Sequence, residues 1–478
     1  MGTPVRIDSL NRDSDWTSIQ VTVLGLGIAG YAAADNLAFL GAQVTALDEG
    51  SSPQLKDKAK LLEFLDVKVR LGQPFSLPEI CDLLIVSPGI HPQHRVIEEA
   101  KQRGITVWGE LELAWRLRNK DAADWLCITG TNGKTTTTLM LESMLRASGL
   151  RSTAAGNIGH SLIEVVMDPA GYDVIAVEVG APQLPYVYSI EPFSSVCLNI
   201  AEDHIDLFGD YNTYKKTKAR VYERTQNVAI YNAQDEATIQ MVEEADVKEG
   251  CRAVGFTLTS PGRSEIGIVE ELIADRAFVE NRSTHALEIC SVDDVKPAGI
   301  HNVANALAAI ALARSYGVSA EAIKLGLLNF QPAPHRVSLV RELDGVKYIN
   351  DSKATNAHAA QTSLLSFDNV IWLAGGDSKN QDFDELARKV SKYLKAVILI
   401  GRDQEQIASA LLKYSPELTI HRIPALEVNA LIEAVTLARN IATVNDVVLL
   451  APACASWDMF DNYAQRGDVF EKAVRELD

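Results

Sequence analysis

The stretch Gly130-Thr-Asn-Gly-Lys-Thr-Thr136 follows the apolar run 125–129 and precedes a stretch with a helical pattern. This order is typical of loops that bind phosphate, because glycines let backbone N–H groups point at phosphate oxygens and the helix N-terminus adds positive potential. Lys134 can reach the β- and γ-phosphates of a nucleotide, and the hydroxyl of Thr135 can coordinate Mg²⁺. Where the strict motif has its first glycine this chain has Ile128, so we interpret the stretch as a shortened variant.

Alternating strand and helix patterns extend from this loop in both directions. Short apolar runs recur before and after it, and stretches with helical periodicity lie between them. This order indicates parallel sheets, because a strand that is followed by a helix returns to the sheet in the same direction. We therefore predict an α/β protein of three domains, each with a mostly parallel sheet: a Rossmann-like domain over 1–112, a central phosphate-loop domain over 113–331 and a second Rossmann-like domain over 332–478.

The composition is that of an ordinary globular protein with a strong negative charge. The 478 residues include 45 Lys and Arg against 63 Asp and Glu, a formal net charge of −18. A nucleic-acid-binding surface is not expected on this balance, so small molecules are the expected partners. The six cysteines show no Cys-x-x-Cys spacing, and the sequence has no signal-peptide or membrane-span pattern. We expect a monomer in the cytoplasm with reduced thiols.

A second glycine-rich turn, Gly25-Leu-Gly-Ile-Ala-Gly30, follows the apolar run 21–24, and Asp48 lies near the end of the next predicted strand. The pattern Gly-x-Gly-x-x-Gly is the fingerprint of dinucleotide-binding turns, in which an acidic residue binds the ribose. Alone, it indicates a nicotinamide-dependent oxidoreductase. The same backbone shape also binds the diphosphate of a UDP-linked substrate, so the motif leaves both ligands open.

Cations and hydroxyls follow three predicted strands of the third segment. Asp351, Lys353 and Thr355 lie within one turn after the first of them, and Lys379 and Ser456 follow two others. Because the carboxyl ends of parallel strands meet at one edge of a sheet, we expect these side chains to form one site. Such a site suits a small substrate that carries carboxylates.

Two residues of the central segment are candidate metal ligands. Glu178 ends an apolar strand, and His204 follows another. Carboxylate oxygens are the ligands that Mg²⁺ prefers, so Glu178 is the stronger candidate. A single His after a strand is more often structural, and on the residues alone we interpret His204 in that way.

Five stretches of the chain together resemble the Mur ligases, the ATP-dependent enzymes that form amide bonds in peptidoglycan synthesis. Motifs of this family occur in all three segments and in the family's order, so the resemblance covers nearly the whole chain. The stretches are Gly130-Thr-Asn-Gly-Lys-Thr-Thr136, Asn199…Glu202-Asp-His204, His301-Asn302…Asn305, Pro334-His-Arg336 and Asn350-Asp-Ser-Lys-Ala-Thr-Asn356. Within the family, the last stretch, Ser87-Pro-Gly-Ile90 and Pro452-Ala-Cys-Ala-Ser456 are similar to the branch that adds D-glutamate.

The resemblance implies a reaction in two steps. ATP phosphorylates the C-terminal carboxylate of UDP-N-acetylmuramoyl-L-alanine, and the amine of D-glutamate then attacks the acyl phosphate, so that phosphate leaves and an amide forms. Two Mg²⁺ ions are implied as cofactors, together with a lysine that carbon dioxide converts into a metal-binding carbamate. A carboxylate is a poor electrophile, so phosphorylation supplies the leaving group while the protein positions the reactants and neutralises charge.

The resemblance also assigns residues to each ligand. For ATP these are Gly130, Thr131, Asn132, Gly133, Lys134, Thr135, Thr136, Asn302, Asn305, Arg336 and Asp351. For the UDP-linked substrate they are Ile28, Ala29, Ser87, Gly89, Asn157 and Gln183, and for D-glutamate Thr355, Lys379, Ser456 and Tyr463. The implied metal ligands are Thr135, Glu178, His204 and Lys218 as its carbamate, and the implied catalytic residues are Lys134, Glu178, His204, Lys218 and Lys353.

Two stretches depart from the family pattern. Where the family has Glu-x-Ser-Ser-aromatic-Gln, this chain has Glu178-Val-Gly-Ala-Pro-Gln183. Proline fixes φ and lacks an N–H donor, so we expect this loop to differ in shape and to alter muramoyl contacts more than the metal site. Asp48 is followed by Glu49-Gly50, so the sequence shows no cation there for the uracil.

Three other functions are weighed against this interpretation. A Mur-type ligase for another amino acid shares the same motifs. A nicotinamide-dependent oxidoreductase explains residues 25–30 but leaves residues 130–136 unexplained, and a non-catalytic nucleotide-binding scaffold predicts ATP binding without phosphate release. Three domains around one site also predict domain closure, with the proline-bearing junction 331–334 as the candidate hinge.

Overall fold

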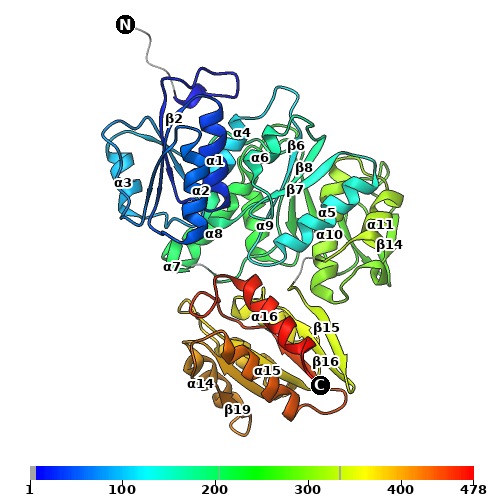
Figure 1. The fold of residues 1–478 in the computed structure, drawn as a ribbon. Helices are drawn as coiled ribbons and strands as arrows, with labels where there is room; N and C mark the ends of the chain where they lie inside the picture. Colours follow the sequence, from blue (N-terminus) through cyan, green and yellow to red (C-terminus); the bar gives the residue numbers. More distant parts are fainter. Residues whose placement is uncertain (1–6, 204, 333–334) are drawn as a thin grey trace. The chain divides into compact units, whose positions relative to one another are not determined.

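The computed structural model describes residues 7–203, 205–332 and 335–478 (Figure 1). The chain divides into two compact units, of which the first ends at residue 330. In the described part of the chain, two sheets belong to the first unit and one to the second. The predicted α/β fold with three mostly parallel sheets is confirmed, and the boundaries at 112 and 331 stay predictions.

The first sheet has five parallel strands in the order β3-β2-β1-β4-β5. Strand β1 lies in the middle, where Val21 pairs with Val44 of β2 on one side and with Leu83 of β4 on the other. The chain reverses its direction of travel across the sheet between β1 and β4, and open α/β sheets bind ligands at such a point. The elements are β1 (Gln20–Leu24), α1 (Ile28–Phe39), β2 (Gln43–Asp48), α2 (Pro53–Glu63), β3 (Lys68–Leu71), β4 (Leu83–Val86), α3 (Arg95–Gln102), β5 (Thr106–Gly109) and α4 (Glu110–Arg116).

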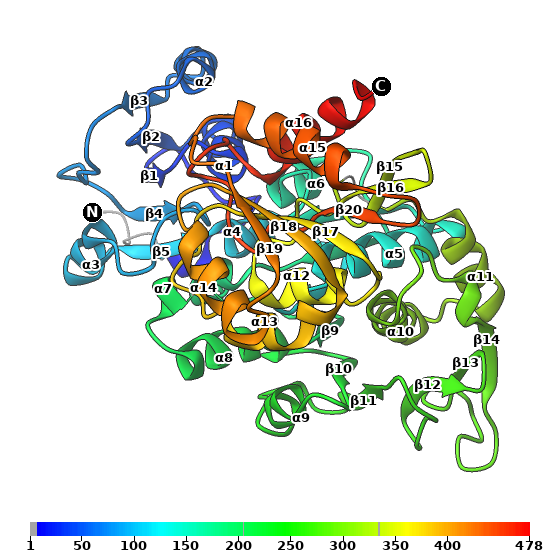
Figure 2. The ribbon, with the colours of Figure 1, turned by 90° about the horizontal axis from the view of Figure 1, so that it is seen from below.

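The second sheet has nine strands in the order β14-β13-β12-β11-β10-β9-β6-β8-β7. The pairs from β7 to β12 are parallel, and β13 and β14 add an antiparallel edge, which Figure 2 shows beyond β11. Its strands are β6 (Asp124–Thr129), β7 (Ser152–Gly156), β8 (Val174–Glu178), β9 (Ser194–Cys197), β10 (Val228–Asn232), β11 (Arg252–Phe256), β12 (Glu265–Val269), β13 (Leu272–Asp275) and β14 (Leu287–Ser291). Its helices and 3-10 turns are α5 (Lys134–Ala147), α6 (Leu162–Met167), η2 (Ala181–Tyr186), α7 (Ile205–Phe208), α8 (Tyr211–Ala219), η3 (Arg220–Tyr222), α9 (Glu236–Glu243), α10 (Ile300–Ser315) and α11 (Ala320–Asn329).

Burial on both faces explains why the central strands are apolar along their whole length. Every residue of β8 is buried, Glu178 at its end included. Helix α10, which is rich in alanine, is buried over most of its length and packs against α5. Small side chains let the two helices approach closely, and this packing brings α10 to the turn that precedes α5.

The third sheet has six strands in the order β15-β16-β20-β17-β18-β19, with β15 antiparallel at one edge. One apolar cluster lies between the sheet and α12 to α14, and another between the sheet and α15 and α16. The elements are β15 (Ser338–Leu343), β16 (Val346–Asn350), α12 (Ala357–Leu364), β17 (Val370–Gly375), α13 (Asp384–Val390), β18 (Leu394–Ile400), α14 (Gln404–Tyr414), β19 (Thr419–Arg422), α15 (Asn429–Ile441), β20 (Val447–Leu450) and α16 (Tyr463–Arg475).

Two apolar or helical runs of the central segment are only in part regular elements. The run 196–200 forms a strand only as far as Cys197, and the N–H of Ile200 donates to the Oδ2 atom of Asp235 (2.9 Å). The run 212–224 is divided between α8, which ends at Ala219, and the tighter turn η3. None of the helices in the described part of the chain is both long and apolar enough to cross a lipid bilayer.

Candidate active site

The turn between β6 and α5 has the backbone shape that a phosphate-binding loop needs. Gly130 and Gly133 have φ angles of 152° and 85°, in the range that favours glycine. A Cβ atom on Gly133 would lie 2.1 Å from the Oδ1 atom of Asn305, so α10 packs directly against the turn. The Nζ atom of Lys134 donates to the carbonyl oxygens of Gly130 (2.8 Å) and Thr131 (2.9 Å). The lysine therefore curls over the turn at the N-terminus of α5, where the helix dipole favours phosphate.

Asn199, which follows β9, holds this phosphate turn in place. Its Oδ1 atom accepts from the backbone N–H of Asn132 (2.9 Å), and its Nδ2 atom donates to the carbonyl of Asn132 (3.1 Å). Its own carbonyl accepts from the N–H of Thr131 (3.0 Å). These bonds fix the turn before a ligand binds, which reduces the entropy cost of binding. The sequence analysis uses Asn199 only as part of a motif, because spacing alone does not link it to residue 132.

Glu178 lies beside the phosphate turn and is 3% exposed. Its Oε2 atom accepts from the hydroxyl of Thr135 (2.7 Å), and its Oε1 atom accepts from the Nδ2 atom of Asn157 (3.0 Å). Thr135 lies in the first turn of α5, after β6, while Glu178 ends β8 and Asn157 follows β7. The carboxyl ends of these three neighbouring parallel strands lie on the same side of the sheet. A carboxylate and a hydroxyl next to a phosphate turn fit Mg²⁺. Among the described residues no three His, Cys, Asp or Glu side chains gather as a metal site.

Lys218, on α8, lies below the same turn and is 1% exposed. Its Nζ atom donates to the carbonyl of Gly130 (2.9 Å) and to the hydroxyl of Thr129 (3.4 Å), and it lies 5.0 Å from the centre of the Tyr214 ring. Burial, and after it the positive charge of Lys134, lowers the pKa of Lys218 to about 7. An amine with a pKa of about 7 is partly neutral at pH 7, and the neutral form is a nucleophile.

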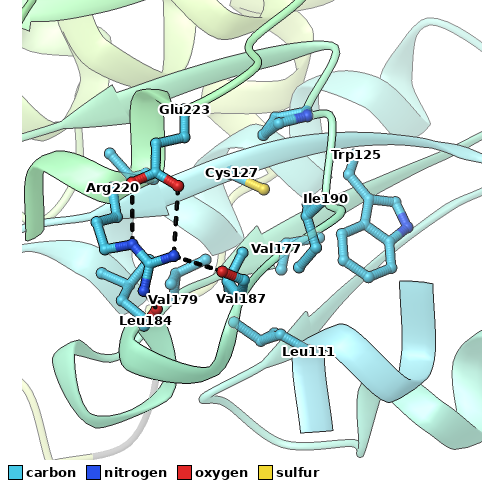
Figure 3. Close-up of a pocket in the computed structure, with 12 residues that line it drawn as sticks. Leu111, Trp125, Cys127, Val177, Val179, Leu184, Val187, Ile190, Arg220 and Glu223 are labelled. Carbon is cyan, nitrogen blue, oxygen red and sulfur yellow. Dashed lines mark hydrogen bonds and ion pairs between the residues drawn. The ribbon is translucent and has the colours of Figure 1, made fainter. Parts of the chain in front are cut away.

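A small apolar cavity lies beside this network (Figure 3). Its lining includes Cys127, Val177 and Leu184, and Arg220 lies at its edge. The guanidinium of Arg220 donates to Glu223 (2.9 Å) and to the carbonyl of Leu184 (2.7 Å), so its charge is compensated and the cavity is not an anion site. Arg220 instead ties the end of α8 to η2, and it thereby fixes the helix that carries the buried lysine.

Gln183 shapes the loop that departs from the family pattern. Its Oε1 atom accepts from the N–H of Gly180 (2.8 Å), and its Nε2 atom donates to the Oε2 atom of Glu110 on α4 (3.4 Å). A Cβ atom on Gly180 would lie 3.1 Å from the Oδ1 atom of Asn157, so the glycine leaves room for Asn157 to reach Glu178. Gln183 is 2% exposed here, and its contact with the UDP-linked substrate stays a prediction.

The turn between β1 and α1 has the close packing of a diphosphate-binding turn. A Cβ atom on Gly30 would lie 1.7 Å from the carbonyl oxygen of Gly25, which also accepts from the hydroxyl of Ser87 (2.9 Å). The Oδ2 atom of Asp48 accepts from the N–H of Leu26 (2.7 Å). In a dinucleotide site this carboxylate binds the ribose, whereas here it already holds the turn. This bond counts against the nicotinamide-dependent oxidoreductase.

The remaining predicted residues of the first unit that the structure describes lie on α1, on the loop after β4 and on α10. Ile28 is 64% exposed and Gly89 is exposed, so both leave surface for a ligand at the point between β1 and β4. Asn302 and Asn305 are buried on α10, and the Nδ2 atom of Asn302 donates to the carbonyl of Pro297 (2.9 Å). Their assignment to the adenine stays a prediction. His204, the predicted second metal ligand, and Pro334 of the predicted hinge lie outside the described residues.

In the second unit, Arg466 joins two of the loops that carry predicted site residues. It is 1% exposed and donates to the hydroxyl (3.0 Å) and the carbonyl (2.8 Å) of Ser352 and to the carbonyl of Cys454 (3.2 Å). The hydroxyl of Ser352 donates to the carbonyl of Tyr463 (2.7 Å). The ammonium of Lys353 lies 4.0 Å from the centre of the Tyr463 ring, which holds it by a cation–π contact.

Asp351 is buried in the same loop as Lys353. It accepts from the hydroxyl of Ser363 and from the N–H of Val337 (3.3 Å). Burial raises the pKa of Asp351 to about 6, although the hydrogen bond from Ser363 and the charge of Arg336 act against this rise. The carboxylate is therefore mostly ionised at neutral pH, and Arg336 lies close enough to influence it.

Thr355, Lys379 and Ser456 lie on the loops after β16, β17 and β20, which are neighbours in the sheet. Asp377 and Ala455 form an isolated bridge, which joins the loop of Lys379 to that of Ser456. The backbone of Lys379 has a φ of 51°, and its N–H donates to the Oδ1 atom of Asp377 (3.0 Å). The order of the strands in the sheet therefore places these three loops next to one another.

Arg466 and Arg220 are the positioning residues that the sequence analysis missed. A signal for Arg466 exists in the sequence, because Phe470 and Val474 follow it at intervals of four and all three are buried on one face of α16. A charged residue at a buried position of such a face indicates a paired charge. For Arg220 the helical pattern gives no comparable signal.

Three family descriptions match the chain. The Mur ligase MurD-like N-terminal domain matches residues 19–109, the Mur ligase middle domain matches residues 128–313, and the Mur ligase glutamate ligase domain matches residues 335–454. Each match contains most of one of the three sheets.

Curated relatives match along nearly the whole chain. The UDP-N-acetylmuramoylalanine–D-glutamate ligase of Streptomyces avermitilis is 48% identical over 97% of this chain and 99% of its own length. The enzyme of the same name from Thermobifida fusca is 43% identical over 96% of this chain and 98% of its own length.

Solved structures share the fold at low identity. The UDP-N-acetylmuramate-alanine ligase MurC of Thermotoga maritima has a TM-score of 0.58 at 17% identity and covers 96% of this chain and 99% of its own. MurF from Acinetobacter baumannii has a TM-score of 0.57 at 20% identity and covers 98% of this chain and 93% of its own. These structures support the three-sheet fold alone.

The buried amine of Lys218 predicts a pH dependence of stability. Between pH 7 and about 10 the folded protein holds this amine neutral, while in the unfolded chain, with a pKa near 10.5, it stays protonated. The unfolded state then binds more protons, so the free energy of unfolding rises with pH. We expect the free energy of unfolding of the wild type, relative to that of Lys218→Met, to increase by up to about 1.4 kcal/mol per pH unit in this range.

Urea unfolding in buffer free of carbon dioxide, at steps from pH 7 to pH 10, measures this difference. The exposed Lys216 of the same helix provides the matched control, and Lys216→Met is expected to differ from the wild type by a constant amount. A difference between the wild type and Lys218→Met that does not change with pH contradicts the prediction.

Proposed function

Because this chain belongs to the Mur ligase family, we propose that it joins D-glutamate to UDP-N-acetylmuramoyl-L-alanine at the expense of ATP, in the synthesis of peptidoglycan precursors. The observation that carries this proposal is the 48% identity, over 97% of the chain, to a ligase of that name. The phosphate turn with Lys134, Thr135 and Glu178 supports ATP as the co-substrate.

In the first step a carboxylate oxygen of the alanyl group attacks the γ-phosphorus of ATP, and ADP leaves. The backbone N–H groups of residues 130–136 and the ammonium of Lys134 bind phosphate oxygens and offset the charge that moves onto ADP. Lys134 exchanges carbonyl partners for phosphate oxygens, which form stronger bonds with a cation. Thr135 and Glu178 would hold Mg²⁺, which would supply further charge neutralisation when bound.

In the second step the amine of D-glutamate attacks the acyl carbon. The tetrahedral intermediate expels inorganic phosphate, which takes the former carboxylate oxygen with it, and the nitrogen loses a proton to give the amide. We propose that Thr355, Lys379, Ser456 and Tyr463 bind the carboxylates and the stem of D-glutamate. Lys353 offsets the negative charge of the acyl phosphate, and the ring of Tyr463 holds its ammonium in one place.

We propose that Lys218 carries a carbamate, formed when its neutral amine attacks carbon dioxide and loses a proton. Its burial and its pKa of about 7 support this step, and the positive charge of Lys134 stabilises the anion that forms. Glu178, His204 and the carbamate would together hold Mg²⁺, and the carboxylate and carbamate oxygens among them are the hard donors that this ion prefers.

The remaining site assignments are proposed on the same grounds. Asn302 and Asn305 lie on the buried face of α10 next to the phosphate turn, which supports a role for them in binding the adenine. Arg336 and Asp351 of the second unit carry opposite charges, which supports a role for them in binding ATP. The proposed nucleotide contacts are Asn302, Asn305, Arg336 and Asp351, and the proposed contacts to the UDP-linked substrate are Ile28, Ala29, Ser87, Gly89, Asn157 and Gln183. We further propose that the protein works as a monomer in the cytoplasm, where ATP is available.

Phosphate release from Mg-ATP tests the proposed function. Purified protein is mixed with UDP-N-acetylmuramoyl-L-alanine and each of a panel of D- and L-amino acids. We expect release only when the nucleotide substrate and D-glutamate are both present, and a loss of about a hundredfold or more in Lys134→Met, because a cation at the transferred phosphate is removed. Release with a different amino acid moves the enzyme within its family, and no release with any pair contradicts the proposal.

Chemical rescue tests the carbamate. Lys218→Ala is expected to lose about tenfold or more of the phosphate-release rate, since a ligand-positioning group is gone, while Lys216→Ala keeps the wild-type rate. Acetate or formate is expected to restore part of the rate, because a small carboxylate can occupy the space of the carbamate. Restoration by methylamine instead of by carboxylates contradicts the carbamate and indicates a role for the ammonium.

A further inference from the structure

A lysine of α2 reaches the turn between β1 and α1. The Nζ atom of Lys58 lies 3.0 Å from the carbonyl oxygen of Leu26 and 3.3 Å from that of Gly27, and it lies 5.6 Å from the centre of the Tyr31 ring. Helix α2 runs beside α1 (Figure 1), and the side chain of Lys58 is half-buried between them.

The turn between β1 and α1 has no cationic side chain of its own, so the charge of Lys58 matters for any anion that binds there. The two turns at the point between β1 and β4, residues 25–30 and 87–90, contain no Lys or Arg. Asp48 adds a carboxylate that is bonded to the turn itself, at 2.7 Å from the N–H of Leu26. A diphosphate that binds there meets the partial positive charge of the α1 N-terminus but also the negative charge of Asp48. A further cation is needed at the turn to favour a doubly charged ligand.

The geometry lets Lys58 supply that cation. An ammonium has three N–H donors, and the two carbonyl oxygens of the turn use two of them. The third is available to a phosphate oxygen. Because both carbonyl partners belong to the turn that binds the ligand, the ammonium is held in place before the ligand arrives, and little side-chain entropy is lost on binding.

We propose that Lys58 binds the diphosphate of the UDP-linked substrate. This inference rests on the proposed function for the identity of the substrate, but the contact itself requires only a uridine diphosphate group at the turn. The proposal assigns a cation to the UDP end of the substrate, where Glu49 and Gly50 provide none.

Steady-state kinetics and three variants test the inference. Lys58→Met keeps the apolar stem and removes the charge, Lys58→Arg keeps the charge, and Lys60→Met removes an exposed lysine of α2 that pairs with Asp57. We expect Lys58→Met to raise the KM for the UDP-linked substrate about tenfold or more with little change in kcat, because a hydrogen bond between charged groups is lost from binding. Lys58→Arg is expected to keep a KM near that of the wild type, and Lys60→Met to leave it unchanged.

Calorimetric titration with UDP and with uridine separates this contact from a structural role and from the proposed function. Lys58→Met is expected to weaken the binding of UDP about tenfold and to leave the binding of uridine unchanged. Equal weakening of both ligands, or a lower thermal midpoint with unchanged KM and UDP affinity, overturns the inference. If the wild type binds UDP but shows no turnover with D-glutamate, the proposed function fails while the titration still decides the role of Lys58.

Discussion

The carbonyl oxygen of Gly130 accepts hydrogen bonds from two lysine side chains, Lys134 at 2.8 Å and Lys218 at 2.9 Å. Two ammonium groups so close together in a buried place repel each other, so one of them must lose its proton or gain an anion. In the proposed reaction, nucleotide phosphates provide the anion for Lys134, and the proposed carbamate makes Lys218 an anion itself. The proposal therefore couples nucleotide binding to the chemical state of Lys218 through one backbone oxygen.

The rest of the first unit holds the groups that surround this oxygen. Glu178 is fixed by Thr135 and Asn157, and a further pair of hydrogen bonds runs from the loop after Glu178 through Gln183 to Glu110 on α4. These contacts link α4, which follows the last strand of the first sheet, to the loop after Glu178, which ends β8 of the second sheet. One of the two departures from the family pattern falls in this loop, and Glu178 is hydrogen-bonded there to Thr135 and Asn157.

The sequence predicts those parts of the site that depend on neighbours along the chain. The phosphate turn and Glu178 could be predicted because a strand end, glycines and a helix start occur together at 130–136 and because a carboxylate ends an apolar strand. Lys218 could be singled out only by the family resemblance, since its burial depends on how α8 packs. Lys58 reaches carbonyl oxygens 31 and 32 positions away, and Arg466 reaches partners 12 and 114 positions away, so no local pattern identifies these partners.

In the proposed reaction, the phosphate turn activates a carboxylate by phosphoryl transfer. The most direct test follows oxygen: UDP-N-acetylmuramoyl-L-alanine labelled with ¹⁸O in both oxygens of the alanyl carboxylate is converted with Mg-ATP and D-glutamate, and the released phosphate is analysed by mass spectrometry. Phosphate that carries one ¹⁸O atom per molecule is the predicted result, because the attacking carboxylate oxygen leaves with the phosphate. Unlabelled phosphate, released together with the amide, would show that no acyl phosphate of the alanyl carboxylate forms.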